Sequence, residues 1–178
     1  MSPTSNTSFQ HRTRNPRTMN LSPRTSLLTS AALLSGTLAA QFDVEWKQCI
    51  GGTSFEEPRA IRALSTGGYM MVGNTDGPNP HTPTGYHGGG DIWAVRLDAE
   101  GAILWQRYIG GNNFDAAEDV CQVTDGGFIV VGSTQSMSGG DFTGCHGGYT
   151  DGVVMKLDSE GNTVWQRCMG GSGDDELN

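Results

Sequence analysis

The sequence has no Cys-x-x-Cys pair, no apolar run long enough to span a membrane, and no segment with helical spacing of its apolar residues. Without closely spaced cysteines, a structural zinc site is disfavoured. The main apolar stretch, Leu27–Ala40, has about fourteen residues, whereas a membrane helix needs about 20. Because helical periodicity is missing, the chain is expected to be built from strands.

The N-terminal part of the chain, up to Ala40, contains no acidic side chain. Its basic residues, apart from one histidine, are four arginines: Arg12, Arg14, Arg17 and Arg24. A basic start, a short apolar run and a small-residue end are typical of a secretory signal peptide. We therefore expect residues 1–40 to be a signal peptide cleaved after Ala40, with Met19 as the more ordinary start. The alternative is an unstructured N-terminal extension.

Beyond position 40 the composition is acidic. All 19 Asp and Glu residues lie there, but only seven of the 11 Lys and Arg residues do, which leaves a net charge near −12. So negative a chain repels a phosphate backbone, and nucleic acid is not an expected partner. Cations, basic proteins and neutral glycans remain open as partners.

The rest of the chain is an internal repeat, and its period of about 60 residues is of the fixed kind that is typical of solenoids, propellers or arrays. Its anchors are Trp46, Trp105 and Trp165, and a glycine pair begins five positions after each of them. Residues 46–75 align with 105–134 without a gap and with ten identities in thirty positions. The single extra residue of the later unit lies between His146 and Asp151, where a loop can absorb it.

Each unit contains four strand-like runs separated by turns rich in Asp and Gly. In the later unit we expect strands at Glu118–Val123, Phe128–Val131, Val153–Leu157 and Thr163–Met169. Short β-branched and aromatic runs that end at glycine, such as Phe128–Val131, predict strands buried on both faces. Four antiparallel strands per unit predict an all-β fold of β-propeller blades, with about two full blades in residues 41–178.

Two segments carry a more specific signature: A-V-R-L-D-A-E-G-A-I-L-W at residues 94–105 and V-M-K-L-D-S-E-G-N-T-V-W at residues 154–165. They resemble the strand–turn–strand signature of quinoprotein-type propeller repeats. The whole unit resembles large secreted repeat proteins of Bacteroidota-like bacteria, which often carry a C-terminal sorting domain. The resemblance covers roughly residues 44–178 and implies a propeller fold and a secreted or outer cell-surface location. For chemistry it implies little, because such propellers occur in cell-surface and polysaccharide-handling proteins.

The four cysteines leave two interpretations open. Cys49 and Cys168 occupy the same position in different units, where the middle unit has Tyr108, and two blades apart they are not expected to meet. Cys121 and Cys145 lie in one unit and could form a disulfide in an exported protein. Isolated buried thiols are the alternative.

Acidic residues recur after every glycine pair: Glu56-Glu57, Asp115 with Glu118-Asp119, and Asp174-Asp175-Glu176. Paired carboxylates can serve glycoside hydrolysis. A catalytic pair is normally unique, however, whereas this cluster is repeated in each unit. We therefore interpret it as a structural loop or cap, and we predict no catalytic residue, no cofactor-binding residue and no metal ligand.

Two kinds of turn and loop also recur. Asp98-x-x-Gly101 and Asp158-x-x-Gly161 are expected to form β-turns, in which Asp bonds backbone amides and Gly adopts positive φ. The loop Ser138–Asp151 and its counterpart Asp76–Asp91 contain oxygen ligands suited to Ca²⁺. Asp141 and Asp151 would be those ligands, but His87 and His146 recur with the loops, which favours a turn-rich connector. The three repeated tryptophans are expected to pack between blades rather than on a sugar.

These observations favour a secreted or cell-surface module that binds a glycan or protein ligand or acts as a structural scaffold, and that is not an enzyme. The alternative is a part of a carbohydrate-active, glycoside hydrolase-like secreted enzyme. A quinone-cofactor dehydrogenase is less favoured, because the basic and metal-ligand residues of a cofactor pocket are not visible in the sequence.

The third copy of the unit stops at Asn178, soon after Trp165. Closed propellers have about four to eight blades. We therefore expect residues 41–178 to be a truncated part of a longer protein that supplies the remaining blades. Alone, such a part is expected to be marginally stable or to self-associate.

Overall fold

The structure is a computed structural model that describes residues 43–78, 85–137, 139–146 and 149–175. The expected signal peptide, Met19 and the cleavage point after Ala40 lie outside the described residues. So do residues 79–84 of the first loop, Ser138, and Glu176 of the last acidic cluster.

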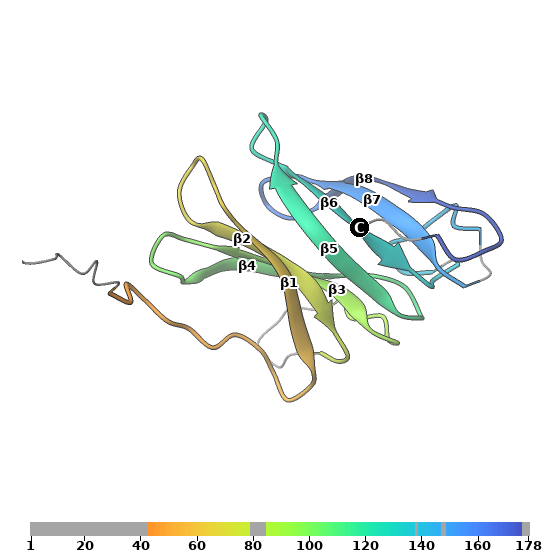
Figure 1. The fold of residues 1–178 in the computed structure, drawn as a ribbon, viewed down its shortest axis with the longest axis horizontal. Coiled ribbons are helices and arrows are strands. Elements are labelled where there is room, and N and C mark those ends of the chain that lie inside the picture. Colours follow the sequence, from red (N-terminus) through yellow and green to blue (C-terminus); the bar gives the residue numbers. More distant parts are fainter. Residues whose placement is uncertain (1–42, 79–84, 138, 147–148, 176–178) are drawn as a thin grey trace, which may run out of the picture. The chain divides into compact units, whose positions relative to one another are not determined.

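The described residues form eight strands and no helix, in two four-stranded sheets (Figure 1). Sheet 1 contains β1 (Glu56–Ala63), β2 (Tyr69–Thr75), β3 (Asp91–Leu97) and β4 (Ile103–Ile109). Sheet 2 contains β5 (Asp115–Gln122), β6 (Phe128–Thr134), β7 (Asp151–Leu157) and β8 (Thr163–Met169). In each sheet the strands pair antiparallel in chain order. The all-β fold and the four antiparallel strands per unit are thus confirmed.

The strand boundaries follow the period of the sequence. β1 and β5 begin at equivalent positions of the two units, and so does each later pair: β2 and β6, β3 and β7, β4 and β8. The irregularity between Pro58 and Ala60 in β1 recurs between Ala117 and Asp119 in β5. The two repeat units therefore form sheets with equivalent strands, and the extra residue of the later unit is absorbed in the loop before β7.

Four strands run further than the sequence predicts. β5 begins at Asp115 and not at Glu118, and β7 begins at Asp151 and not at Val153. The apolar runs were expected to end at Gly73 and Gly132, but β2 and β6 continue through them to Thr75 and Thr134. A Cβ at Gly132 would lie 2.0 Å from the Ala116 carbonyl oxygen, and one at Gly73 equally close to the Glu57 carbonyl. These glycines therefore do not end the strands; they allow the neighbouring strand to approach closely.

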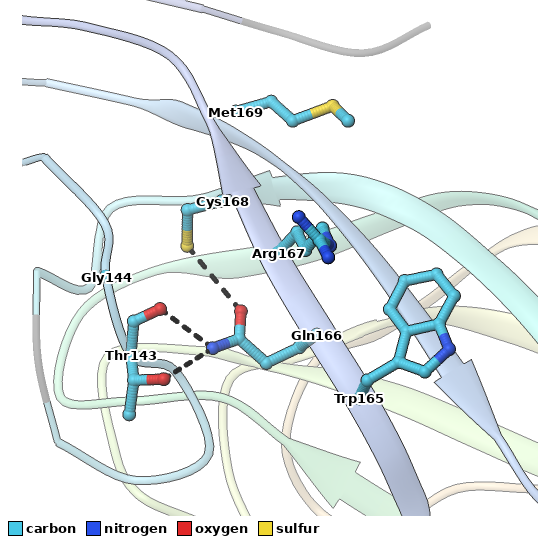
Figure 2. A pocket seen from close by; sticks show the side chains of 7 residues that line it. All are labelled: Thr143, Gly144, Trp165, Gln166, Arg167, Cys168 and Met169. Carbon is cyan, nitrogen blue, oxygen red and sulfur yellow. Dashed lines mark hydrogen bonds between the residues drawn. The ribbon is translucent and has the colours of Figure 1, made fainter.

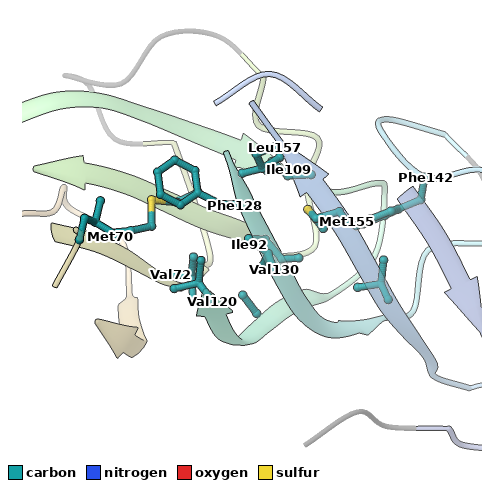
Figure 3. Close-up of a cluster of buried hydrophobic side chains, with 14 residues drawn as sticks. Met70, Val72, Ile92, Ile109, Val120, Phe128, Val130, Phe142, Met155 and Leu157 are labelled. Carbon is teal, nitrogen blue, oxygen red and sulfur yellow. The ribbon is translucent and has the colours of Figure 1, made fainter. Parts of the chain in front are cut away.

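The main core lies between the two sheets (Figure 3). Sheet 1 contributes the face that bears Trp105, which we call its tryptophan face; the matching face of sheet 2 bears Trp165. The buried residues on the tryptophan face of sheet 1 are Met70, Val72, Ile92, Ala94 and Ile109. Sheet 2 contributes its other face, which we call the receiving face. Its buried residues are Phe128, Val130, Val153, Met155 and Leu157.

A second, smaller core covers the receiving face of sheet 1. Trp93, Val95 and Leu97 are buried there, and the N-terminal segment packs against them through Trp46 and Ile50. Sheet 1 is therefore covered on both faces, by this segment on one side and by sheet 2 on the other.

Burial on both faces, which the sequence predicts for the apolar run Phe128–Val131, is not observed in β6. Phe128 and Val130 on its receiving face are buried, whereas Ile129 and Val131 on its tryptophan face are only half-buried. The prediction is wrong for this strand because nothing among the described residues packs over that face of sheet 2.

Candidate functional site

The carboxylate of Asp115, in the acidic cluster after the middle glycine pair, is fully buried and bonded to the loops around it. Its Oδ2 accepts hydrogen bonds from the Gly111 amide at 2.7 Å and from Ser136 Oγ at 3.1 Å. Its Oδ1 accepts from the Thr134 hydroxyl. These three bonds join the end of sheet 1 to the β6–β7 loop, which is a structural task.

A second buried carboxylate, Asp91, begins β3 and caps the loop before it. Its Oδ2 accepts from the His87 amide at 2.9 Å and lies 3.3 Å from His87 Nδ1. Its Oδ1 is buried and has no hydrogen-bond partner among the described residues. In the later unit Asp151 accepts from the His146 amide at 2.6 Å in the same way. Sequence reasoning assigned these histidines to the loops but did not identify the carboxylates as their caps.

Asp91 and Asp115 flank Gly110, where a Cβ would lie 2.8 Å from Asp91 Cγ and from Asp115 Oδ2. Desolvation by burial raises the pKa of Asp91 to about 6, against the lowering effect of the bonds from His87. Burial also raises the pKa of Asp115, and its three hydrogen bonds oppose that rise. Both side chains are completely shielded from solvent.

The carboxylate arrangement recurs in the next unit. Asp175 Oδ2 accepts from the Gly171 amide at 2.7 Å, as Asp115 does from Gly111, and the Asp175 amide donates to the Thr150 carbonyl at 2.7 Å. In the first unit the Glu56 carboxylate lies against Gly51, where an added Cβ would be 2.8 Å from Glu56 Oε2. This repetition supports the structural interpretation of the clusters.

The remaining members of the acidic clusters lie on the surface of the strands. Glu57 pairs with Arg59 at 3.2 Å within β1. Asp119 pairs with Arg62 of β1 at 2.6 Å, which links the two sheets. The described clusters thus do not bring two accessible carboxylates to one reaction centre.

The predicted Asp-x-x-Gly turns are confirmed. Asp98 Oδ1 accepts from the Ala102 amide at 2.7 Å, and Gly101 has a φ of +83°. Asp158 Oδ1 accepts from the Glu160 and Asn162 amides, and Gly161 has a φ of +82°. Each aspartate holds its turn closed between the last two strands of a sheet.

The two loops considered for Ca²⁺ use their carboxylates elsewhere in the described parts. Asp141 Oδ2 accepts from the Gly110 amide at 3.2 Å and lies 3.8 Å from His87 Nδ1, so it connects the sheets. Asp151 caps the His146 amide. No group of three or more His, Cys, Asp or Glu side chains in the described ranges is placed to hold a metal ion.

The disulfide differs from the pairing considered for Cys121 and Cys145. Cys145 is bonded to Cys168 of β8, while Cys49 and Cys121 are free and exposed, so the alternative of isolated buried thiols is also wrong. Cys121 belongs to β5 and Cys168 to β8, which are the opposite edges of sheet 2. Because the β6–β7 loop carries Cys145 to the β8 edge, Cys121 is out of its reach.

Trp105 packs between the two sheets, as predicted. Its ring lies 6.1 Å from that of Phe128 at 67°, covers Gly161, and donates through Nε1 to the Ser159 carbonyl at 2.9 Å. Next to it, Arg107 Nη2 donates to the Glu160 carbonyl at 3.0 Å. The role of this arginine was missed, although W-Q-R is repeated in two units and signals it.

Trp46 makes the matching contact one sheet earlier. Its ring lies 5.4 Å from that of Tyr69 at 66° and covers Gly101. Tyr69 and Gly101 are the counterparts of Phe128 and Gly161. The N-terminal segment thus takes the place on sheet 1 that β4 takes on sheet 2.

Trp165 differs from the other two repeated tryptophans because it lies on the exposed face of β8. Figure 2 shows it beside Arg167 and Met169, with Gln166 and Cys168 turned to the other side of the strand. Gln166 Nε2 donates to the carbonyl and hydroxyl oxygens of Thr143 at 2.8 Å. Trp165 is 41% exposed and Met169 49%, and together with Arg167 they line a hollow at this edge of sheet 2. The prediction that every tryptophan packs between blades is therefore not met at Trp165.

No protein-family model matches the chain, and no curated protein matches it either. Within the described part of the chain no helix is long and apolar enough to cross a membrane.

Proposed function

We propose that this chain is a non-catalytic, propeller-type repeat module that is exported and that binds a ligand or serves as a scaffold at the cell surface. The observation that carries the proposal is the repeated use of carboxylates as loop caps, of which Asp91, Asp115 and Asp151 are buried. Asp115 and Asp175 bind the amide of the second glycine in successive pairs, and Asp91 and Asp151 cap the histidine loops. This repetition supports a structural role for the acidic residues.

The packing of the sheets supports a propeller arrangement. Both sheets have four antiparallel strands in chain order, and β5 follows β4 directly and lies across β1, β2 and β3. Repetition of one such sheet against the next, with each face covered by its neighbour, is how propeller blades bury their apolar surfaces.

The alternative of a glycoside hydrolase is disfavoured by the same carboxylates. Hydrolysis needs two carboxyl groups that flank a substrate bond. Asp91 and Asp115 flank Gly110, but both are fully buried and bonded to backbone amides. A sugar ring has no access to them in this arrangement.

A glycan array combined with a reducing-sugar release assay on the full chain tests the proposal. We expect that any polysaccharide bound on the array is left intact, with no reducing ends released. Release of reducing sugar that survives in Asp91→Asn and Asp115→Asn would place hydrolysis elsewhere, and release that these variants abolish would make the buried pair catalytic. Either result would overturn the non-catalytic assignment.

Export is tested separately by sequencing the N-terminus of secreted material. The basic and apolar elements before Gln41 lead us to expect a mature N-terminus within a few residues of position 41. Soluble cytoplasmic protein that retains Met1 or Met19 would contradict export and would leave the binding role untouched.

A further inference from the structure

We infer that the tryptophan face of sheet 2 is a docking surface for a second copy of this chain, which binds head to tail through the receiving face of its own sheet 1. The chain already contains one such contact, because the tryptophan face of sheet 1 is covered by the receiving face of sheet 2. The inference rests on this internal contact and does not depend on export or on a ligand.

The two tryptophan faces share some side chains and differ in others. The buried Met70, Ile92, Ala94 and Ile109 of sheet 1 are replaced by Ile129, Gly152, Val154 and Met169 on sheet 2. Val72, Trp105 and Arg107 of sheet 1 correspond to Val131, Trp165 and Arg167 of sheet 2, and Arg96 corresponds to Lys156. On sheet 1, Val72 and Ile109 are buried and Trp105 and Arg107 are half-buried. On sheet 2, Trp165, Arg167 and Met169 are exposed. Sheet 2 thus exposes a second copy of the tryptophan face, which in sheet 1 packs against a neighbouring sheet.

The partner face also exists in this chain, and it is only lightly covered. Tyr69 and Gly101 of sheet 1 match Phe128 and Gly161, which receive Trp105 in the internal contact. Trp46 holds that position on sheet 1, but residues 43–55 form no strand, and Lys47, Gln48 and Cys49 are exposed. A segment held mainly by Trp46 and Ile50 can be displaced by a complete strand.

The N-terminal segment also matches the receiving face of sheet 1 less well than β8 of a second copy does. It has Gln48 where β4 and β8 have Arg107 and Arg167. Arg107 donates to the Glu160 carbonyl in the internal contact. Arg167 of one copy can make the equivalent bond to the Glu100 carbonyl of the next. Gln48 has a shorter side chain that ends in a neutral amide and lacks the charged guanidinium.

Sedimentation velocity of the full chain from low micromolar to near-millimolar concentration tests the inference. A head-to-tail contact leaves a free face at each end until a ring closes, and propellers close at about four to eight blades. With two sheets per chain, we therefore expect the mean mass to rise with concentration to that of about two to four chains. Met169→Glu places a charge in the contact and should weaken association by about tenfold or more. Met137→Glu is the control, because Met137 is, like Met169, an exposed methionine, but it lies in the loop after β6 and not in β8. A chain that stays monomeric throughout, or variants with equal effects, would overturn the inference.

Two further variants test the orientation. Trp46→Ala frees the receiving face of sheet 1 and should strengthen association, since the competing segment loses its anchor. Met169→Glu keeps its receiving face, so labelled Met169→Glu should still bind wild type and should shorten its assemblies. If labelled Met169→Glu fails to bind wild type, the copies meet by their tryptophan faces and the head-to-tail arrangement is wrong. Circular dichroism confirms that each variant is folded before it is compared.

Discussion

The tryptophan faces of the two sheets differ in burial although Val72, Trp105 and Arg107 of sheet 1 recur on sheet 2 as Val131, Trp165 and Arg167. On β4, Ile109 is 3% exposed, and on β8 the corresponding Met169 is 49% exposed. Two positions earlier in these strands, Arg107 and Arg167 are identical, and both strands have the same place in their sheets. What differs is the neighbour: sheet 2 covers β4, and no described residue covers β8 in the same way. The exposure of a residue in this protein therefore depends on whether another sheet packs over its strand, and not only on the sequence of the strand.

β1 and β5, the first strands of the two sheets, also differ in burial according to whether a neighbouring sheet packs against them. β5 is largely buried, with Asp115, Ala116 and Ala117 shielded, because it lies against sheet 1. β1 has the same register and bulge but is mostly exposed, including Ile61 at 49%. A unit of this repeat thus folds to the same local geometry whether or not a neighbour buries it.

The disulfide offers a third comparison. Cys145 and Cys168 of sheet 2 occupy the positions of Tyr86 and Tyr108 in sheet 1. Those tyrosine rings meet edge to face, 5.8 Å apart at 79°. A covalent link and an aromatic contact therefore hold the same loop to the fourth strand. The covalent form lies in sheet 2, where no described residue packs over the tryptophan face of β8.

The largest expected effect comes from breaking the contact between the sheets at Phe128. Phe128→Ala removes a buried ring that packs against Trp105, and it should lower the free energy of unfolding by about 3 to 5 kcal/mol. Tyr69→Ala, the matching change on sheet 1, removes a half-buried ring that faces only the N-terminal segment and should cost about 1 to 2 kcal/mol. Urea unfolding at a concentration where both variants are monomeric measures the difference. Equal losses would contradict the assignment of the main core to the space between the sheets.

Removing the disulfide should have the next largest effect. Cys145→Ser combined with Cys168→Ser opens a link with a sequence separation of 23 and should destabilise the oxidised protein by about 3 kcal/mol. Replacing the tyrosine contact by Tyr86→Leu should cost about 1 kcal/mol. Urea unfolding with and without a reductant separates the two, because the reductant should lower the stability of wild type and leave the double variant unchanged. A reductant effect that needs Cys121 would contradict the pairing.

The pH dependence of stability tests the carboxylate that sheet 2 helps to bury. The pKa of Asp91 is raised to about 6 in the folded chain, so the folded state binds this proton more tightly than the unfolded state. Its stabilising contribution is present below about pH 4 and is lost as the pH rises to about 6, by roughly 2 kcal/mol. His87 and Asp115 face the same carboxylate and modulate the slope.

Asp91→Asn should flatten the stability profile between about pH 4 and pH 6, since the amide does not titrate in this range. Urea unfolding of wild type and variant at several pH values gives the two slopes. An unchanged slope would show that Asp91 titrates in the folded chain as it does in the unfolded chain.

The smallest expected difference compares two tryptophans. Trp105→Ala loses the packing on Phe128 and the bond to Ser159 and should cost about 2 kcal/mol. Trp165→Ala changes an exposed side chain and should cost less than about 0.5 kcal/mol in the monomer. Unfolding followed by circular dichroism in dilute solution checks both values. If Trp165→Ala costs as much as Trp105→Ala, sheet 2 is covered on both faces even in the monomer.

Local structure could largely be predicted from the residues. The period of the tryptophans and glycine pairs set the spacing of the strands, and Asp98-x-x-Gly101 marked a turn whose aspartate and glycine take the expected roles. These features depend on contacts within a few residues and on alternation along one strand, so the order of residue types is enough to specify them. The ends of β2 and β6 were missed, because the close approach at Gly73 and Gly132 involves the neighbouring strand.

Only the tertiary structure decided which cysteines meet and which faces are buried. Cys121 and Cys145 follow each other in the chain, but the order of strands in sheet 2 places β5 and β8 on opposite edges and brings Cys145 to Cys168. Asp91 likewise has an unremarkable position in the sequence, and its raised pKa arises from the desolvation that the packed loops and sheets produce. Ile109 and Met169 have equivalent sequence contexts and opposite burial. The sequence of a strand determines which side chains each of its faces carries. Whether those side chains are buried depends on the surface that packs against them, and a local sequence pattern carries no information about that surface.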